Sequence, residues 1–176
     1  MKQNQKIRPV ILCGGSGSRL LSKYNKYSLP KQFIDFGGWN LFEKALLRIK
    51  TSNFAPPIIS TNKKYLKTVK QYLKKTKIRK YKIVLEPAKK NTAPAILSTA
   101  LIKDIPNNQP LMFFSADHLI EKMSIFNKAI NKNKLNLNKD NIFIFGIKPT
   151  SPSSEYGYFL TKKIKGNINK VTRFIE

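Results

Sequence analysis

Short apolar runs alternate with longer amphipathic segments along most of this chain, and no other feature constrains the fold as strongly. The apolar runs predict strands over residues 8–13, 56–60, 82–85, 111–114 and 142–147. The segments between them carry apolar residues at helical spacing and predict helices over 39–50, 61–75, 92–103 and 121–135. Because alternating strands and helices form βαβ units, we expect an α/β fold with a mainly parallel sheet and helices on both faces.

Two further strands are predicted over 156–161 and 170–175, with no helix between them. This break in the alternation suggests that the sheet is mixed at one edge. The arrangement is Rossmann-like, and in such sheets ligands bind at the carboxyl ends of the strands, where the strand order reverses. The chain has no internal repeat and no low-complexity linker, which favours one domain over residues 1–176.

The composition argues against a disordered, secreted or membrane-bound protein. The 176 residues are 41% hydrophobic, enough to build a core. No apolar run approaches the roughly 20 residues that span a bilayer. The run at Pro9–Cys13 is too short for the core of a signal peptide. Cys13 is the single cysteine of the sequence, which excludes an internal disulfide bond. We therefore expect a cytoplasmic protein with no membrane partner.

The net charge of +25, from 34 basic and 9 acidic residues, raises nucleic acid as a partner. The basic residues are nearly all lysine, however, and are spread along the chain with five arginines among them. A phosphate-binding surface tends to cluster its charge and to use arginine where geometry matters. We therefore expect no specific nucleic-acid partner, and a nucleic-acid-binding module stays as an alternative that rests on charge. The positive field would also steer a small polyanionic substrate toward the protein.

A glycine-rich loop, Gly14-Gly15-Ser16-Gly17-Ser18-Arg19-Leu20, directly follows the first predicted strand. Glycine tolerates positive φ and lets backbone N–H groups approach a ligand closely, so such a loop can bind an anion, phosphate above all. Arg19 would add a planar set of donors. The loop lacks the Gly-Lys-Ser/Thr of a Walker A motif, and Leu20 stands in place of the third glycine of the dinucleotide fingerprint. The alternative is a tight structural turn.

Asp117 ends the fourth predicted strand, where a carboxylate faces the ligand crevice of an open α/β sheet. Nucleotide-bound Mg²⁺ takes one or two carboxylates together with phosphate oxygens, so Asp117 is a candidate metal ligand. The alternative is a cap for the following helix. Lys31, on a loop after the glycines, could neutralise a triphosphate or could be one more solvated lysine. His118 is the single histidine of the sequence and receives no chemical role.

A polar loop joins the third predicted strand to the helix over 92–103. Asn91 and Thr92 stand where helix N-caps belong, so capping is one interpretation. The other is that this loop, which begins at Glu86, reads a nucleobase or a sugar with its polar groups.

Several of these segments, taken in order, carry a resemblance to a known family. The matching stretches are LCGGSGSRL, LPKQF, LEPAKKNTAPAI, SADH, FGIKPTSPSSEYGY and VTRFIE, and they run from residue 12 to residue 176. Together they resemble the bacterial mannose-1-phosphate guanylyltransferases of the sugar nucleotidyltransferase superfamily. The resemblance implies a nucleotidyltransferase fold of the GT-A-like type and the transfer of GMP from GTP to mannose 1-phosphate, with Mg²⁺ as cofactor and release of pyrophosphate.

The resemblance also assigns roles to residues of this chain. The catalytic residues it implies are Arg19, Lys31 and Asp117, with Asp117 as the Mg²⁺ ligand and Lys31 holding the departing pyrophosphate. The nucleotide-binding residues it implies are Gly14, Gly15, Gly17, Ser18, Glu86, Asn91 and Thr92. The segment beside the sugar would be Tyr156-Gly157-Tyr158, and Glu176 would contact sugar hydroxyls.

This sequence departs from the family pattern in ways that affect the expectations. Leu21-Ser22 replaces the usual Trp-Pro, and the segment up to Pro30 is about one residue longer. The family pattern continues after Glu176 with a sugar-phosphate lysine and a second metal-binding aspartate. Residues 1–176 are therefore expected to be the amino-terminal part of an incomplete catalytic domain, with little activity of its own and with apolar surface exposed near Phe174 and Ile175.

Two alternatives to the guanylyltransferase interpretation stay open. One is a sugar nucleotidyltransferase of other specificity, such as a thymidylyl- or uridylyltransferase acting on a glucose 1-phosphate. The other is a truncated, non-catalytic nucleotide-binding protein. Nothing in the sequence indicates an oligomeric state.

Overall fold

The computed structural model describes residues 6–15, 29–88, 91–137, 141–165 and 168–175. The chain divides into two compact units, Met1–Asn141 and Ile142–Glu176, and each is described by itself. The first unit contains the parallel sheet and the second contains a β-hairpin.

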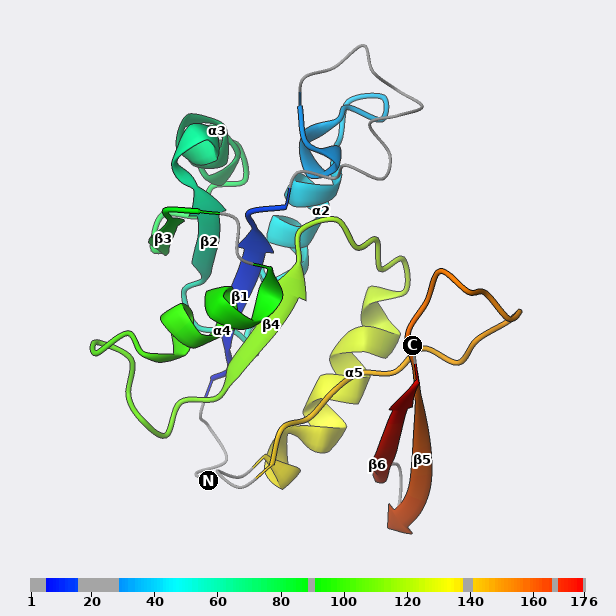
Figure 1. Cartoon of the computed structure of the whole chain (residues 1–176). Helices are drawn as coiled ribbons and strands as arrows, with labels where there is room; N and C mark the ends of the chain where they lie inside the picture. Colours follow the sequence, from blue (N-terminus) through cyan, green and yellow to red (C-terminus); the bar gives the residue numbers. More distant parts are fainter. Residues whose placement is uncertain (1–5, 16–28, 89–90, 138–140, 166–167, 176) are drawn as a thin grey trace. The chain divides into compact units, whose positions relative to one another are not determined.

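Four parallel strands form the sheet of the first unit in the order β3-β2-β1-β4 (Figure 1). They are β1 (Arg8–Cys13), β2 (Ile58–Asn62), β3 (Lys82–Glu86) and β4 (Leu111–Ser115). In register, Val10 of β1 lies opposite Ile58 on one side and Phe113 on the other. The chain proceeds from β1 outward to β2 and β3, then returns to the opposite side of β1 for β4. This reversal places a topological switch point between the carboxyl ends of β1 and β4.

Helices cover both faces of this sheet, as the sequence predicts. They are α2 (Leu41–Arg48), α3 (Leu66–Lys75), α4 (Thr92–Ala100) and α5 (Met123–Asn133), with 3₁₀ turns η1 (Lys31–Phe33), η2 (Lys63–Tyr65) and η3 (Lys134–Asn136). Adjacent strand residues point to opposite faces. Ile11 and Ile59 pack in one core with side chains of α2, α3 and α5, whereas Val10 and Ile58 pack with Ile105 in a second core below α4. The two central strands, β1 and β2, are therefore buried on both faces, whereas β3 and β4 are only partly buried.

Asparagine side chains begin two of the helical segments. The Asn40 side chain accepts a hydrogen bond of 2.8 Å from the backbone N–H of Glu43 and caps α2. Asn62 accepts one of 3.1 Å from the backbone N–H of Lys64 and caps η2, at the start of the helix predicted over 61–75. Such caps satisfy backbone donors that have no partner in the first helical turn.

The second unit contains a separate two-stranded antiparallel sheet, formed by β5 (Tyr158–Lys165) and β6 (Ile168–Ile175). The two predicted strands in this region are confirmed, and they pair with each other. Among the described strands they form a sheet of their own, so the parallel sheet does not gain the mixed edge that we expected. The hairpin register is irregular between Leu160 and Thr161 and again between Lys163 and Lys165.

The predicted strand over residues 142–147 is wrong. This segment has apolar and β-branched residues, but it forms no ladder in the part of the chain that is described, and Ile142 and Ile147 are 95% and 90% exposed. A β-carbon at Gly146 would lie 2.4 Å from the Phe159 ring. The segment therefore packs against the hairpin through a glycine instead of pairing with it, because β propensity alone supplies no partner for the backbone.

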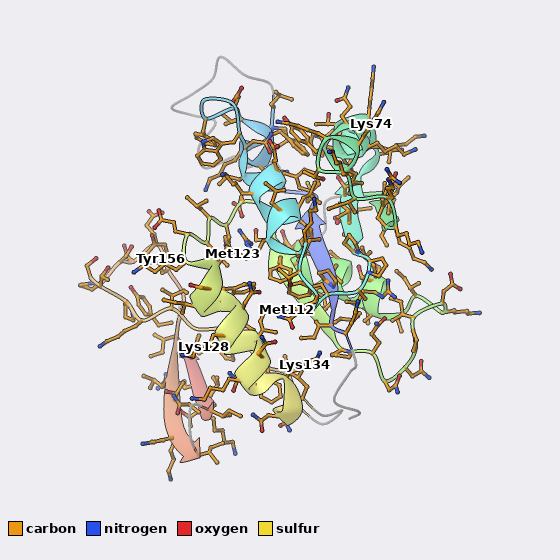
Figure 2. All side chains as sticks on the ribbon, turned by 180° about the vertical axis from the view of Figure 1, so that it is seen from behind. Lys74, Met112, Met123, Lys128, Lys134 and Tyr156 are labelled. Atoms are coloured by element: carbon orange, nitrogen blue, oxygen red, sulfur yellow. The ribbon has the colours of Figure 1, made fainter. Side chains whose placement is uncertain are left out.

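The lysines extend from several elements of the first unit, for example Lys74 on α3 and Lys128 on α5 (Figure 2). Both are exposed.

Among the residues that the structure describes, no helix is both long enough and apolar enough to cross a bilayer.

Candidate functional site

The carboxyl ends of β1 and β4 meet at the switch point of the sheet. Gly14 and Gly15 follow β1, and Ala116 and Asp117 follow β4. The Ala116 backbone N–H donates a hydrogen bond of 3.1 Å to the Leu12 carbonyl, so the pairing of the two strands continues to the residue before Asp117. The sheet thereby brings two segments about a hundred residues apart in the sequence to one edge.

Lys31 and Asp117 face each other at this edge. The Lys31 Nζ lies 3.8 Å from the Asp117 Oδ2, and the two side chains are 32% and 36% exposed. The Ser115 hydroxyl donates to the other carboxylate oxygen, Oδ1. Helix α5 begins at Met123 with Lys122 as its N-cap, so the alternative in which Asp117 caps that helix is wrong. Asp117 is a half-buried carboxylate that keeps one oxygen directed toward a cation.

Gln32 holds the start of the glycine loop, a role that the sequence analysis did not assign. Its side-chain amide donates a hydrogen bond of 3.0 Å to the Gly15 carbonyl and a longer one of 3.5 Å to the Cys13 carbonyl. Thr61 donates to the same Cys13 carbonyl at 3.2 Å. No spacing in the sequence links Gln32 to Gly15, so only the folded chain reveals this contact.

Gly14 lies against the carboxylate of Glu86. A β-carbon at Gly14 would lie 2.7 Å from the Glu86 Oε2, whereas one at Gly15 would meet no atom within 4 Å. The other oxygen of Glu86, Oε1, accepts a hydrogen bond of 2.7 Å from the Ser60 hydroxyl. In the described part of the chain, positive φ among glycines occurs at Gly37 and Gly38. Close approach, not a left-handed backbone, therefore explains the glycine at position 14.

Asn91 and Thr92 lie at the start of α4 and are both exposed. Asn91 occupies the N-cap position but makes no side-chain cap hydrogen bond, and its backbone has φ of 64°. The capping interpretation is therefore wrong for the Asn91 side chain. A non-glycine residue in this region of φ is strained, and such strain is concentrated at functional sites.

Cys13 is buried beneath the site. Burial raises the pKa of its thiol to about 12, because the charged thiolate is poorly solvated there, and the hydrogen bonds with Gln32 and Thr61 offset this only in part. A thiol of this pKa stays neutral near pH 7, which agrees with the absence of any catalytic role for Cys13 in the sequence analysis.

The remaining predicted residues lie elsewhere. Gly17, Ser18, Arg19 and Glu176 lie outside the residues that the structure describes. Tyr156 and Gly157 belong to the second unit, where Tyr156 is 67% exposed. Within the described ranges, no group of three or more histidine, cysteine, aspartate or glutamate side chains gathers as a metal site. Asp117 could thus hold a cation as a single protein carboxylate, with phosphate oxygens as further ligands.

Comparison with known proteins gives consistent relatives. The Escherichia coli mannose-1-phosphate guanylyltransferase is 33% identical over 177 residues, which cover 96% of this chain and 38% of the relative. The alginate biosynthesis protein AlgA of Pseudomonas fluorescens is 32% identical, with coverage of 96% and 36%. This chain thus spans little more than a third of the length of these relatives.

Solved structures share the fold. The crystal structure of mannose-6-phosphate isomerase from Helicobacter pylori superposes with a TM-score of 0.76 at 30% identity, over 97% of this chain and 60% of that one. A Thermus thermophilus structure described as mannose-1-phosphate geranyltransferase gives a TM-score of 0.77 at 23% identity, over 97% and 50%. Both superpositions show that these proteins share the α/β fold of this chain.

A family model described as nucleotidyl transferase matches residues 8–176. The match includes β1, the glycine loop, the Lys31–Asp117 pair and the Glu86 loop. This chain belongs to the nucleotidyl transferase family.

Proposed function

We propose that this chain is the amino-terminal part of a nucleotidyltransferase catalytic domain that transfers GMP from GTP to mannose 1-phosphate. One observation carries the proposal: the approach of Lys31 to Asp117 beside Gly14 and Gly15, at the switch point of the sheet. A cation, a carboxylate and backbone N–H groups at one edge form the set that a metal-bound triphosphate requires. The names of the Escherichia coli relatives support the choice of mannose 1-phosphate and GTP.

In the proposed reaction, a phosphate oxygen of mannose 1-phosphate attacks the α-phosphorus of GTP in line. The new P–O bond forms as the bond between the α-phosphorus and the bridging oxygen breaks, and pyrophosphate leaves with that electron pair. The attacking oxygen is already ionised near pH 7, so no general base is required. Lys31, Arg19 and the glycine loop would neutralise the triphosphate, since two anions must be brought together before they can react.

Asp117 fits the divalent cation that the family implies, and we assign Mg²⁺. The Ser115 hydroxyl holds one carboxylate oxygen and leaves the other, partly exposed, on the side of Lys31. A single carboxylate with phosphate oxygens is a usual environment for nucleotide-bound Mg²⁺. When bound, the ion would withdraw charge from the phosphate oxygens and from the leaving pyrophosphate.

Glu86 would recognise the guanine base by accepting hydrogen bonds from it. Its Oε1 is engaged by Ser60 and its Oε2 lies against Gly14, so the carboxylate is held at the strand ends beside the glycine loop. Guanine presents two adjacent donors, the N1–H and the 2-amino group, and one carboxylate can accept from both. Asn91 and Thr92 belong to the same loop. Tyr156, Gly157 and Glu176 are assigned to the sugar by resemblance.

The test measures pyrophosphate release by the native gene product with four nucleoside triphosphates, each paired with mannose 1-phosphate and glucose 1-phosphate. We expect the highest kcat/KM with GTP and mannose 1-phosphate. A higher value with a thymidine or uridine nucleotide and glucose 1-phosphate would replace this function with the alternative specificity. Calorimetry of GTP binding with Mg²⁺ distinguishes the enzyme from a non-catalytic nucleotide-binding protein, because the latter would bind GTP without turnover.

Glu86→Gln tests the base assignment, with Glu121→Gln, an exposed glutamate after β4, as the matched control. A Gln side chain presents an amide that repels one guanine donor. We expect the preference for GTP over ATP to fall about tenfold in Glu86→Gln and to stay constant in Glu121→Gln. Equal preferences in the two variants would remove Glu86 from base recognition.

A further inference from the structure

Arg48 is a buried cation that the sequence analysis did not single out. It is the last residue of α2 and is 3% exposed. One terminal nitrogen, Nη2, donates a hydrogen bond to the backbone carbonyl of His118, and the guanidinium carbon lies 6.0 Å from the centre of the Phe114 ring. The sequence carried a signal for it, because Arg48 stands seven residues after Leu41 and so falls on the apolar face of its helix.

Burial of the charged Arg48 side chain costs folding free energy. The Arg48 Nε is buried and has no hydrogen-bond partner among the described residues. Burial also lowers the pKa of the guanidinium, because a charge is poorly solvated there. An apolar side chain of similar length would fill the same space without this penalty, and replacing buried charges in this way is often neutral or stabilising. Stability alone therefore does not explain an arginine at position 48.

The contact that Arg48 makes is next to the candidate metal ligand. Asp117 lies between Ala116, whose N–H is bonded to Leu12 of β1, and His118, whose carbonyl is bonded to Arg48 of α2. The backbone is thus fixed on both sides of Asp117, by the sheet on one side and by a helix on the other. The Ser115 hydroxyl then orients the carboxylate itself.

We propose that Arg48 is a positioning residue that fixes the loop after β4, so that the Asp117 carboxylate is preorganised for a divalent cation. The proposal rests on the metal assignment of the proposed function. Groups that hold a metal ligand in place typically contribute about 10–100-fold to metal affinity. Arg48 touches neither the cation nor the substrate, and acts through the His118 carbonyl.

Binding of Mn²⁺ together with GTP, which supplies the phosphate oxygens, is followed by NMR with the sugar phosphate left out so that no turnover occurs. His118 is the single histidine of the sequence, so its imidazole proton is a unique reporter beside Asp117. Mn²⁺ bound at Asp117 broadens that signal, and a titration gives the midpoint. We expect Arg48→Met to raise the midpoint about tenfold or more, while its thermal stability is unchanged or higher. Arg48→Lys, which keeps the charge and a donor, should recover part of the affinity.

Leu46→Val is the matched control, since Leu46 is a fully buried neighbour on the same helix. It should lower thermal stability and leave the Mn²⁺ midpoint within a factor of two. An unchanged midpoint in folded Arg48→Met overturns the proposal and leaves the metal assignment intact. If the wild-type signal does not broaden, or broadens equally in Asp117→Asn, the metal assignment fails and this proposal fails with it.

A second measurement uses the unmodified chain and covers the case in which Arg48→Met does not fold. Because the Arg48 Nε is buried, its Nε–H signal should exchange slowly and stand out among the five arginines. Mg²⁺ added to saturation should shift this signal, because the metal loop and the guanidinium are joined through His118. A signal that does not move while the His118 resonance shifts would overturn the proposal.

Discussion

The large apolar side chains of the strands differ in solvent exposure between the two units of the molecule. In the first unit, Ile11, Ile58 and Ile59 are fully buried between the sheet and its helices. In the second, Ile164 and Phe174 of the hairpin are 64% and 69% exposed, as expected for Phe174 from sequence. A parallel sheet with helices on both faces removes the apolar side chains of its central strands from water, whereas a two-stranded hairpin buries little by itself. The buried core lies in the first unit, and so does the Lys31–Asp117 pair.

The largest expected effect contrasts Leu46→Ala with Phe174→Ala. Leu46 is fully buried, so its truncation leaves a cavity and should cost about 2–5 kcal/mol of unfolding free energy. Phe174 retains a contact with Phe159, at 6.2 Å between ring centres, and its loss should cost below about 1 kcal/mol. Far-UV circular dichroism in urea, which follows the secondary structure of both units, measures the two shifts. Similar midpoint shifts for the two variants would contradict the contrast.

The second prediction compares the chemistry of the units. Asp117→Asn should lower turnover about 10²–10³-fold, the usual cost of one preorganised electrostatic group, with little change in stability. Tyr156→Phe, in the second unit, removes one hydroxyl and should cost about fivefold to tenfold. Pyrophosphate release by the native gene product measures both. Near-wild-type turnover in Asp117→Asn would remove Asp117 from the site.

The prediction of elements from sequence succeeded where a segment has its partners within the first unit. The four strands of the parallel sheet and the four helices that cover it occur where periodicity placed them, because burial on both faces leaves a readable apolar pattern. The segment over 142–147 has the same composition but pairs with no strand in the described part of the chain, and composition does not reveal a missing pairing partner. Pairing across long sequence separations is a property of the folded chain.

The residues of the candidate site also divide into those that the sequence could predict and those that it could not. The glycine loop, Glu86 and Asp117 were identifiable because each lies at the carboxyl end of a predicted strand. The contacts of Gln32 with Gly15 and of Arg48 with His118 were not, since they join residues 17 and 70 positions apart through tertiary structure. The roles of Arg19, Ser18, Gly17 and Glu176 stay predictions that rest on the resemblance.

A third prediction tests the close approach of Gly14 to Glu86. Gly14→Ala forces the Glu86 carboxylate, the end of a flexible side chain, to move away from Ser60, and loss of that hydrogen bond costs about 1 kcal/mol. Gly15→Ala meets nothing within 4 Å and should change stability by less than about 0.5 kcal/mol. Urea unfolding followed by Trp39 fluorescence compares the two. If both variants unfold at the same urea concentration, Gly14 is not required for space.

The smallest effect concerns Cys13, at the buried end of β1. Its pKa is raised to about 12 in the folded chain from 9.0, so the unfolded chain loses its proton first as the pH rises. The contribution of the buried Cys13 thiol to the unfolding free energy is fully present below pH 9. It declines above that pH, by roughly 1 kcal/mol at pH 10. The fall in unfolding free energy between pH 8 and pH 10 should be smaller in Cys13→Ala by this amount. Identical pH profiles would show that the thiol does not contribute.

The 3₁₀ turn η1 makes three separate contacts in the first unit. Lys31 faces Asp117, Gln32 holds Gly15, and Phe33 is buried beside Phe42 and Tyr72. Both ends of the connection between Gly15 and Leu29 are therefore anchored, whatever its length. Doubling the length of a loop costs only about 0.6 kcal/mol in closure entropy. The one-residue difference from the family pattern in that connection is therefore compatible with an unchanged Lys31–Asp117 pair.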